Sequence, residues 1–447
     1  MHHILRAVGL LTILLLPSSV LAQNTDIEAL AGLQFNFGNP GARALGMGGA
    51  FLALADDASA AEANPAGLTI LRRPEVSVEA RRTAIGQTFA TGGSYPFLST
   101  KTFSARSTEI AFASVVVPWK NFAFAAYVHR PLDFGNEANL LDEYTTPTFH
   151  LEQGGLVDRV ACERSPRCET YQIYPYRTRA DLQLTTIGGA GAWKIGRVSL
   201  GAALRYQRFS EEAKTTRVDL DVAGQPSFVV IQENGSRLFG RDHDEEWSVA
   251  TGMKWQVREN FSLGAVWHQG ASFPAPIAAA QASAVPEIVR VVDFRVPGSV
   301  GVGLSWRPAA ALTLNADAIR ISYSDLVGDF ASVIEYGTEA PGEIEALHGY
   351  GVDDGTEWHA GIEYYIPVRT SVALRAGWWR DPAHSIEWRG PVVTRHEAAA
   401  MILFPETAAN DHYTVGIGVS WPLFQIDAAW DHGQRLQTGS ISFVARF

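Results

Sequence analysis

Several stretches of this chain alternate between apolar and polar residues with a period of two, which predicts β-strands with one apolar face. From Tyr413 to Trp421 the odd positions hold Tyr, Val, Ile, Val and Trp, whereas the even positions hold Thr, Gly, Gly and Ser. None of the apolar faces carries a charge. This is what lipid contact predicts, because Arg or Lys on the lipid face of a barrel costs about 2 to 4 kcal/mol. The same split recurs near residues 198–206, 247–255, 358–366, 372–378 and 424–430.

Five tryptophans favour a membrane barrel over a soluble β-sandwich, whose strands would alternate as well. Each stands at or just past the end of an alternating strand, where a short turn leads into the next strand. An indole ring has an apolar body and a polar N–H, so it prefers the boundary between hydrocarbon and water. The residues that predict this aromatic girdle are Trp119, Trp193, Trp255, Trp306 and Trp421.

The patterns give fourteen candidate strands, of which six pairs are joined by short turns while the other connections are mostly long and polar. Short turns on one side and long loops on the other are typical of an outer-membrane barrel. We therefore predict an all-β fold, a 14-stranded antiparallel transmembrane β-barrel. The strands lie near residues 75–84, 107–118, 121–130, 180–194, 197–209, 244–257, 259–269, 296–307, 310–323, 356–367, 369–380, 412–422, 424–432 and 438–447.

The first residues have the features of a secretory signal peptide. Arg6 precedes a mostly apolar run from Val8 to Leu16, and Val20-Leu-Ala22 resembles a cleavage site. We expect cleavage after Ala22, so that residues 1–22 form the signal peptide and residues 75–447 the barrel. No later stretch reaches the roughly 18 apolar residues that a transmembrane helix needs. The chain is therefore expected to be exported to the bacterial cell outer membrane.

Two features of the later strands refine this interpretation. The final strand places Ile441, Phe443 and the terminal Phe447 on one face, which resembles the aromatic C-terminus of outer-membrane barrels. Near residues 318–319 the apolar phase changes, which suggests a β-bulge that turns both Asp317 and Arg320 toward the lumen. The alternative is that the alternation was simply misassigned there.

Composition narrows the functions that the chain can have. A net charge of −11 argues against nucleic acid as a partner. The sequence contains no Gly-x-Ser-x-Gly elbow, phosphate-binding glycine loop or His-Glu-x-x-His pair, so we expect no enzyme activity, no cofactor and no metal. Its only cysteines, Cys162 and Cys168, lie close together in a polar stretch, and in an exported protein they are expected to form a loop disulfide.

Five motifs, spread from the N-terminal segment to the last strands, resemble the FadL-type long-chain fatty acid transporters and the related aromatic-hydrocarbon channels of outer membranes. The motifs are Ala55-Asp-Asp-Ala58, Asn64-Pro-Ala-Gly67, Val296-Pro-Gly-Ser-Val-Gly301, Tyr323-Ser-Asp325 and Asp411-His-Tyr-Thr414. The segment from Gly41 to Gly49 is more similar to a broader branch that includes barrel proteins serving secretion.

The resemblance implies an N-terminal plug, residues 23–74, inside the barrel, with a turn at Asn64, Pro65 and Ala66. This fits physically, because a barrel well above eight strands leaves a lumen that its own side chains do not fill. A movement of the plug near these three residues would then release a ligand. The alternative is that they form an ordinary helix-terminating turn.

Two predicted outer loops contain apolar runs that a water-facing loop would not normally keep. One is Phe273-Pro-Ala-Pro-Ile277, which continues through Ala278 to Val285, and the other is Ala398-Ala-Ala-Met401-Ile402-Leu403-Phe404. Because exposed apolar patches often mark binding sites, we expect these loops to collect a hydrophobic ligand. The alternative is that the two loops pack on each other as a lid.

A fatty acid also carries a carboxylate, which an arginine can hold through paired hydrogen bonds. Arg205, Arg320 and Arg375 are the inward-facing candidates, although each could instead pair with a lumen acid such as Asp317, Glu363 or Asp427. Our leading hypothesis is passive uptake of hydrophobic compounds, with a small-molecule ligand and membrane lipid as partners and a monomer favoured. The alternative is an outer-membrane barrel that binds or shuttles secreted proteins.

Overall fold

The computed structural model describes residues 37–140, 147–152, 155–173, 175–220, 226–238, 245–279, 288–327, 349–366 and 370–447. The predicted signal peptide, residues 1–22, and the first part of the predicted plug, residues 23–36, lie outside the described residues.

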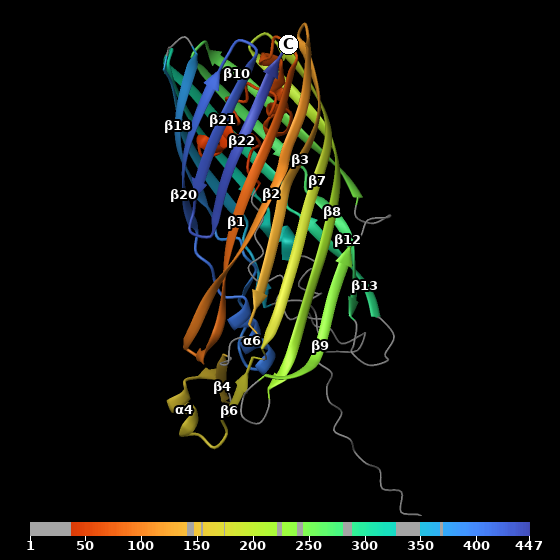
Figure 1. The fold of residues 1–447 in the computed structure, drawn as a ribbon, viewed down its shortest axis with the longest axis vertical. Helices are drawn as coiled ribbons and strands as arrows, with labels where there is room; N and C mark the ends of the chain where they lie inside the picture. Colours follow the sequence, from red (N-terminus) through yellow and green to blue (C-terminus); the bar gives the residue numbers. More distant parts are fainter. Residues whose placement is uncertain are drawn as a thin grey trace, which may run out of the picture.

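Fourteen antiparallel strands form a closed barrel (Figure 1). The first strand, β1 (Glu75–Ser94), pairs with the last, β22 (Leu436–Arg446), from Glu75↔Arg446 to Ile85↔Leu436, and this pairing closes the cylinder. The predicted fold class is therefore confirmed. The other barrel strands are β2 (Phe97–Trp119), β3 (Phe122–Asn139), β7 (Tyr176–Ile195), β8 (Val198–Leu220), β10 (Glu245–Arg258), β11 (Phe261–His268), β14 (Ser299–Ala309), β15 (Leu312–Ile321), β17 (Gly355–Ile366), β18 (Ser371–Asp381), β20 (Asn410–Ser420) and β21 (Phe424–His432).

The two ends of the barrel differ. The short connections and the C-terminus lie at one end, here called the turn end, which is uppermost in Figure 1. At the opposite loop end β1 and β2 continue well past their predicted bounds and meet in a hairpin at Ser94↔Phe97. The sequence prediction ended early because alternation stops once neither face of the strand meets hydrocarbon: residues 99–102 are all exposed.

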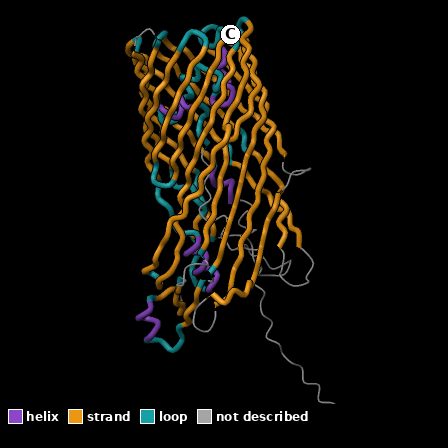
Figure 2. Tube along the Cα trace, viewed as in Figure 1, coloured by secondary structure: helices purple, strands orange, loops and turns teal. Residues whose placement is uncertain are grey.

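Smaller elements gather at the loop end. Helices α4 and α6 lie there (Figure 1), and Figure 2 shows further helical turns inside the barrel nearer the turn end. No helix among the described residues is long and apolar enough to cross a membrane. The loop-end elements are β4 (Thr148–Glu152), β5 (Gly155–Val157), α4 (Arg159–Glu163), β6 (Glu169–Gln172), β9 (Pro226–Leu238), β12 (Ala271–Ala279), β13 (Ile288–Val296), η2 (Tyr323–Val327), β16 (Tyr350–Gly351), β19 (Glu387–Trp388) and α6 (Arg395–Leu403).

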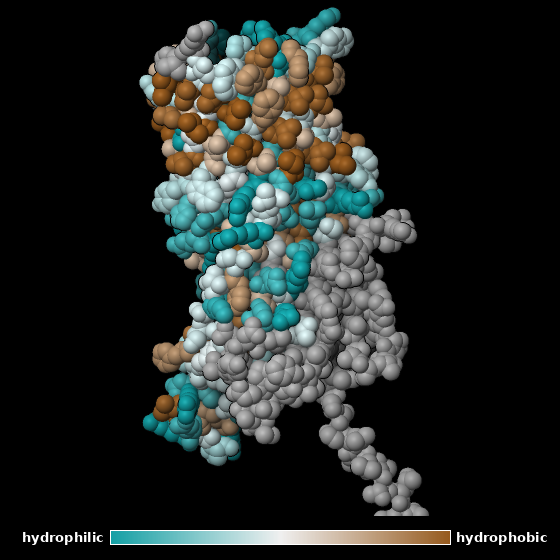
Figure 3. All heavy atoms as spheres, viewed as in Figure 1, coloured by the Kyte–Doolittle hydropathy of each residue, from teal (hydrophilic) through white to brown (hydrophobic). Residues whose placement is uncertain are grey.

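An apolar belt surrounds the half of the barrel nearer the turn end. Figure 3 shows this belt in brown and a hydrophilic band directly below it. Outward side chains such as Val302, Val415 and Ile417 are 56%, 60% and 49% exposed, respectively. Apolar side chains at this exposure, arranged as a ring, are stable only where hydrocarbon rather than water surrounds the wall.

Tryptophans mark both edges of the belt. Four of the five predicted girdle residues, Trp119, Trp193, Trp255 and Trp306, are exposed at the turn end, while the fifth, Trp421, is half-buried and stacks on Phe424. A second row, which the sequence analysis did not identify, consists of the exposed residues Trp247, Trp267, Trp358 and Trp430. The two rows enclose the apolar belt, as the two interfaces of a bilayer require.

Residues 37–74, here called the luminal segment, lie inside the barrel and comprise α2 (Ala42–Gly46), α3 (Ala60–Ala63) and η1 (Pro65–Ile70). Where the segment meets the wall, the inward residues of several strands are glycines. A Cβ added at Gly361 would lie 2.3 Å from the carbonyl oxygen of Met47, and one at Gly377 would lie 2.2 Å from the amide nitrogen of Gly48. These glycines allow the two backbones to approach closely.

The predicted bulge in β15 was wrong. The strand pairs without interruption with β17 and, from Ser299↔Ile321 to Trp306↔Leu314, with β14; Arg320 lies opposite Val300, on the exposed outer face. Asp317 does face the lumen, but Arg320 points outward. The apolar phase changes because the lumen wall itself becomes apolar toward the loop end, where Ile321 is fully buried in an internal cluster.

Candidate functional site

The turn formed by Asn64, Pro65 and Ala66 rests against the barrel wall. The side-chain oxygen of Asn64 accepts a hydrogen bond from the Ala66 amide at 3.2 Å, and its Nδ2 donates to the carbonyl oxygens of Leu52 at 2.8 Å and Met253 at 3.3 Å. Pro65 occupies the first turn of η1, where a missing N–H carries no penalty. One asparagine thus joins two parts of the luminal segment to β10.

A buried ionic network joins α2 to the opposite strands. Arg43 holds Glu363 of β17 through two hydrogen bonds of 2.9 Å, and its third nitrogen contacts Asp56 at 2.5 Å. Arg375 of β18 lies between Glu363 at 2.7 Å and Asp427 of β21 at 2.8 Å. Arg375 therefore faces the lumen, as predicted. It pairs with the lumen acids Glu363 and Asp427, as the alternative interpretation of this arginine proposed.

A second ionic group surrounds Glu62 of α3. Its Oε1 lies 3.3 Å from Nη2 of Arg205 on β8 and 3.5 Å from Nδ1 of His129 on β3. The backbone carbonyl of Glu62 also contacts Nε2 of His268 at 3.2 Å. Arg205 is thus inward and buried, next to the luminal segment.

Two further contacts fix the loop between α2 and α3. Asp317 accepts hydrogen bonds from the amides of Phe51 at 2.6 Å and Leu52 at 2.9 Å. The ammonium of Lys254 donates to the carbonyl oxygen of Leu54. The luminal segment is therefore held by many polar contacts along its length, each of which satisfies a buried group that would otherwise lack a partner.

A cavity lies in the lumen on the loop side of the luminal segment. Leu45, Gly48 and Gly49 of the segment form part of its surface. Its apolar wall is shared with the internal cluster at the loop end. These apolar lining residues are Phe37, Ile85, Leu132, Ile319, Trp379 and Leu436. Among its polar residues Arg81 pairs with Glu79, and Arg130 with Glu109. The cavity inside the barrel is therefore lined by apolar side chains together with polar and charged ones, among them Glu357, His359 and Asp431.

The two apolar loops form the core of the loop end. Phe273 is fully buried, 5.5 Å from the ring of Phe209, and Phe404 is 1% exposed in the same cluster. Ile402 packs against Phe149 in a neighbouring cluster, with Met401 at its edge. Leu403 is half-buried, and the side chain of Ile277 lies outside the described residues. Phe273 and Phe404 thus belong to one internal cluster and are buried rather than exposed to water.

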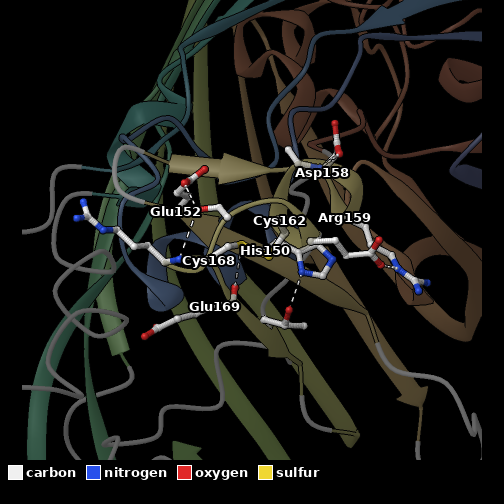
Figure 4. Close-up of a disulfide and its surroundings, with 12 residues drawn as sticks. His150, Glu152, Asp158, Arg159, Cys162, Cys168 and Glu169 are labelled. Carbon is white, nitrogen blue, oxygen red and sulfur yellow. Dashed lines mark hydrogen bonds and ion pairs between the residues drawn. A yellow bond between two sulfur atoms is a disulfide. The ribbon is translucent and has the colours of Figure 1, made fainter.

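A small module, residues 147–173, projects from the loop end beyond the barrel (Figure 1). Cys162 and Cys168 are joined by a disulfide within it, beside His150 and Glu152 (Figure 4). Asp158 caps α4 by accepting a hydrogen bond from the Ala161 amide at 2.7 Å. Phe149 and Leu151 of the module pack with Ala398 and Ile402 of α6, so the module and this helix form one body.

Sequence reasoning identified some of these residues and missed others. Asn64, Pro65, Ala66, Arg205 and Arg375 all lie at the interface between the luminal segment and the wall, whereas Arg320 lies on the outer surface and contacts Asp354 at 3.6 Å. The partners Glu62 and His129 were missed. Both residues could have been identified from the sequence, because Glu62 lies two positions before Asn64 and His129 occupies the next inward-facing position of β3.

The closed barrel, its lipid-facing belt and its two tryptophan rows define a transmembrane β-barrel of the outer-membrane type. Three solved structures share the architecture. A Pseudomonas aeruginosa FadL homologue matches with a TM-score of 0.61 and 14% identity, over 93% of this chain and 100% of its own. The CymD monoaromatic hydrocarbon channel matches with a TM-score of 0.52 and 14% identity, over 93% and 99%. The Ralstonia pickettii toluene transporter TbuX matches with a TM-score of 0.50 and 15% identity, over 92% and 99%.

No protein-family model and no curated protein matches this sequence. At such identities the structural likeness concerns the fold. In its fold the chain is a FadL-type barrel, as the sequence motifs predict.

Proposed function

We propose that the protein is a passive uptake channel of the bacterial outer membrane for hydrophobic compounds such as long-chain fatty acids. The observation that carries this proposal is the apolar cavity inside the lumen, between the loop-end cluster and the luminal segment. Ligand sites are typically concave and mostly apolar, with a few polar groups that fix orientation. The likeness to structures named as a hydrocarbon channel and a toluene transporter supports the same class of ligand.

In the proposed route the loops around Phe273, Ile277 and Met401 to Phe404 first take up the ligand. It then reaches the apolar cavity, where Phe37 and Trp379 contribute aromatic surface. The N-terminal residues 23–74 act as the plug, and a displacement of the turn at Asn64, Pro65 and Ala66 opens the way beyond it. Transport follows the concentration gradient of the ligand.

Uptake by reconstituted protein tests the proposal. Purified barrel in liposomes is given radiolabelled dodecanoate or toluene, and the amount retained inside is compared with that of protein-free liposomes. We expect faster uptake of at least one of the two compounds. Equal rates for both compounds with and without protein would contradict the proposal. Co-purification with secretion components would then favour the role in binding or shuttling secreted proteins.

A further inference from the structure

A second cavity, here called the latch cavity, lies beside α3 of the luminal segment. Its lining includes two sets of side chains of different chemistry, here called the polar half and the apolar half. One half is polar and includes Glu62, His129, Arg205 and Gln207; the other is apolar and includes Leu52, Val266, Ile319 and Ile321. An apolar chain with a polar end matches such a surface better than a purely apolar compound does.

The ion pair at the polar half leaves hydrogen-bonding capacity unused. Arg205 and Glu62 share the single 3.3 Å contact described above, and among the described residues Nε of Arg205 and Oε2 of Glu62 have no partner although both are buried. A guanidinium and a carboxylate bind best through two parallel hydrogen bonds. Arg43 and Glu363 achieve that geometry nearby, so the looser Glu62–Arg205 pair is the more exchangeable one.

The surrounding side chains keep this polar half in place. Gln207 donates to Thr186 at 3.3 Å and accepts from Ser248 at 2.8 Å, which fixes it in the wall. Both ring nitrogens of His129 lack a hydrogen bond within the described structure, and the residue is 2% exposed. Buried donors without partners are costly, and a carboxylate placed here would accept from Nε of Arg205 and from an N–H of His129.

We propose that the Glu62–Arg205 pair is an exchangeable latch operated by a carboxylate ligand. The carboxylate of an amphipathic ligand in the latch cavity binds the fork of Arg205, while its chain lies along the apolar half. Glu62 loses its cation, and the hold on α3 weakens. Asn64 follows two positions later, so the change is passed directly to the turn that contacts β10. This inference rests on the proposed uptake function and makes Arg205 the residue that links ligand class to plug movement.

Matched ligands separate charge recognition from hydrophobic transport. Uptake of dodecanoate and of 1-dodecanol, which share the same chain length, is measured in liposomes for wild type, Arg205→Gln and Arg205→Lys. We expect Arg205→Gln to lower dodecanoate uptake at least about tenfold and dodecanol uptake less than about twofold, because only the carboxylate uses the charged fork. Arg205→Lys should restore part of the difference. Arg380→Gln, which removes an outward cation, is the matched control.

Hydrogen exchange measures the latch independently of transport. We expect dodecanoate, but not dodecanol, to speed exchange of the amides of residues 60–64 in wild type. Glu62→Gln and Arg205→Gln should both exchange quickly without ligand, because each breaks the pair, and dodecanoate should not speed the exchange of Arg205→Gln further.

The outcomes separate the two proposals. If Arg205→Gln lowers uptake of both ligands equally and dodecanoate leaves exchange unchanged, the latch is wrong. If wild type transports neither dodecanoate, dodecanol nor toluene but dodecanoate still speeds exchange, the latch stands and the uptake function is wrong.

Discussion

Arg43 and Glu363, which are 320 positions apart in the chain, form a two-point ion pair inside the barrel, with both hydrogen bonds at 2.9 Å. The pair joins the luminal segment to β17, and Glu363 also holds Arg375. Glu363→Gln therefore leaves two buried guanidinium groups without a shared charge partner.

We expect Glu363→Gln to destabilise the protein by up to about 3 to 5 kcal/mol, because two buried arginines lose their common carboxylate and keep Asp56 and Asp427 as charge partners. The temperature at which the folded barrel loses its compact mobility on an electrophoresis gel measures this change. The control is Arg159→Gln, whose side chain is 73% exposed and pairs with Glu163 on the surface. Its effect should stay below about 1 kcal/mol. Equal midpoints for Glu363→Gln and wild type would contradict the buried network.

The contact between Asn64 and the wall depends on Gly252. A Cβ at this position would lie 2.1 Å from the side-chain oxygen of Asn64. Gly252→Ala should displace the turn and allow small solutes to leak through the barrel, which single-channel conductance in planar bilayers detects. Gly189→Ala serves as the control, because a Cβ there meets nothing within 4 Å. If both variants conduct alike, the turn does not seal the lumen.

The apolar belt predicts where charge is tolerated. Ile417 lies within the belt and is 49% exposed, so Ile417→Arg should lower barrel stability by about 2 to 4 kcal/mol if this position lies near the bilayer midplane. Ser104 also faces outward, but it lies beyond the belt, and Ser104→Arg should have little effect. Urea titration of protein folded into lipid vesicles compares the two. An equal loss of stability in the two variants would show that the apolar belt does not mark the membrane-spanning part of the wall.

The loop-end cluster makes a prediction about ligand capture. Ile402 and Phe404 are 7% and 1% exposed, so aspartate at these positions adds an unpaired charge to an apolar core. We expect the double variant Ile402→Asp with Phe404→Asp to lower ligand binding, measured with labelled dodecanoate and toluene. Val393→Asp, at a position that is 56% exposed, is the control. Unchanged affinity in a folded double variant would show that these loops take no part in capture.

His384 gives the loop end a pH dependence. It follows β18 and stacks on Tyr323, with ring centroids 4.3 Å apart. Burial alone lowers the pKa of His384, but Asp381, 3.1 Å from Nδ1, contributes to raising it above the ordinary value. A raised histidine pKa stabilises the fold fully below the unfolded pKa of about 6.5, and this contribution disappears as the pH rises through the folded pKa.

The variant His384→Gln should therefore melt below wild type by roughly 2 to 4 °C at acidic pH. The difference in melting temperature between the two proteins should become smaller as the pH rises, because His384 of wild type then loses the proton that makes its pair with Asp381 ionic. Thermal unfolding of both proteins in the same detergent across this pH range measures the gap. A gap that widens with increasing pH would show that the neutral imidazole is the stabilising form.

The sequence by itself determined the barrel. In an alternating strand such as that from Tyr413 to Trp421, the local sequence shows which face meets lipid, because each side chain on the wall points either to hydrocarbon or to the lumen. The count of fourteen strands and the short turns follow from the same local pattern. For β21 the predicted bounds coincide with the observed ones, Phe424–His432.

Only the tertiary structure decided what occupies the lumen. The inward residues of one strand say nothing about which distant residues they meet. Arg205 and Arg375 were recognised as inward, but the pairing of Arg205 with Glu62, and of Arg43 with the Glu363 that also holds Arg375, was not predicted. Arg320 was misplaced for a related reason. Toward the loop end the lumen contains an apolar cluster to which several barrel strands and the loop-end elements contribute. This cluster reverses the local pattern of polar and apolar faces, and the reversal depends on contacts between residues far apart in the chain.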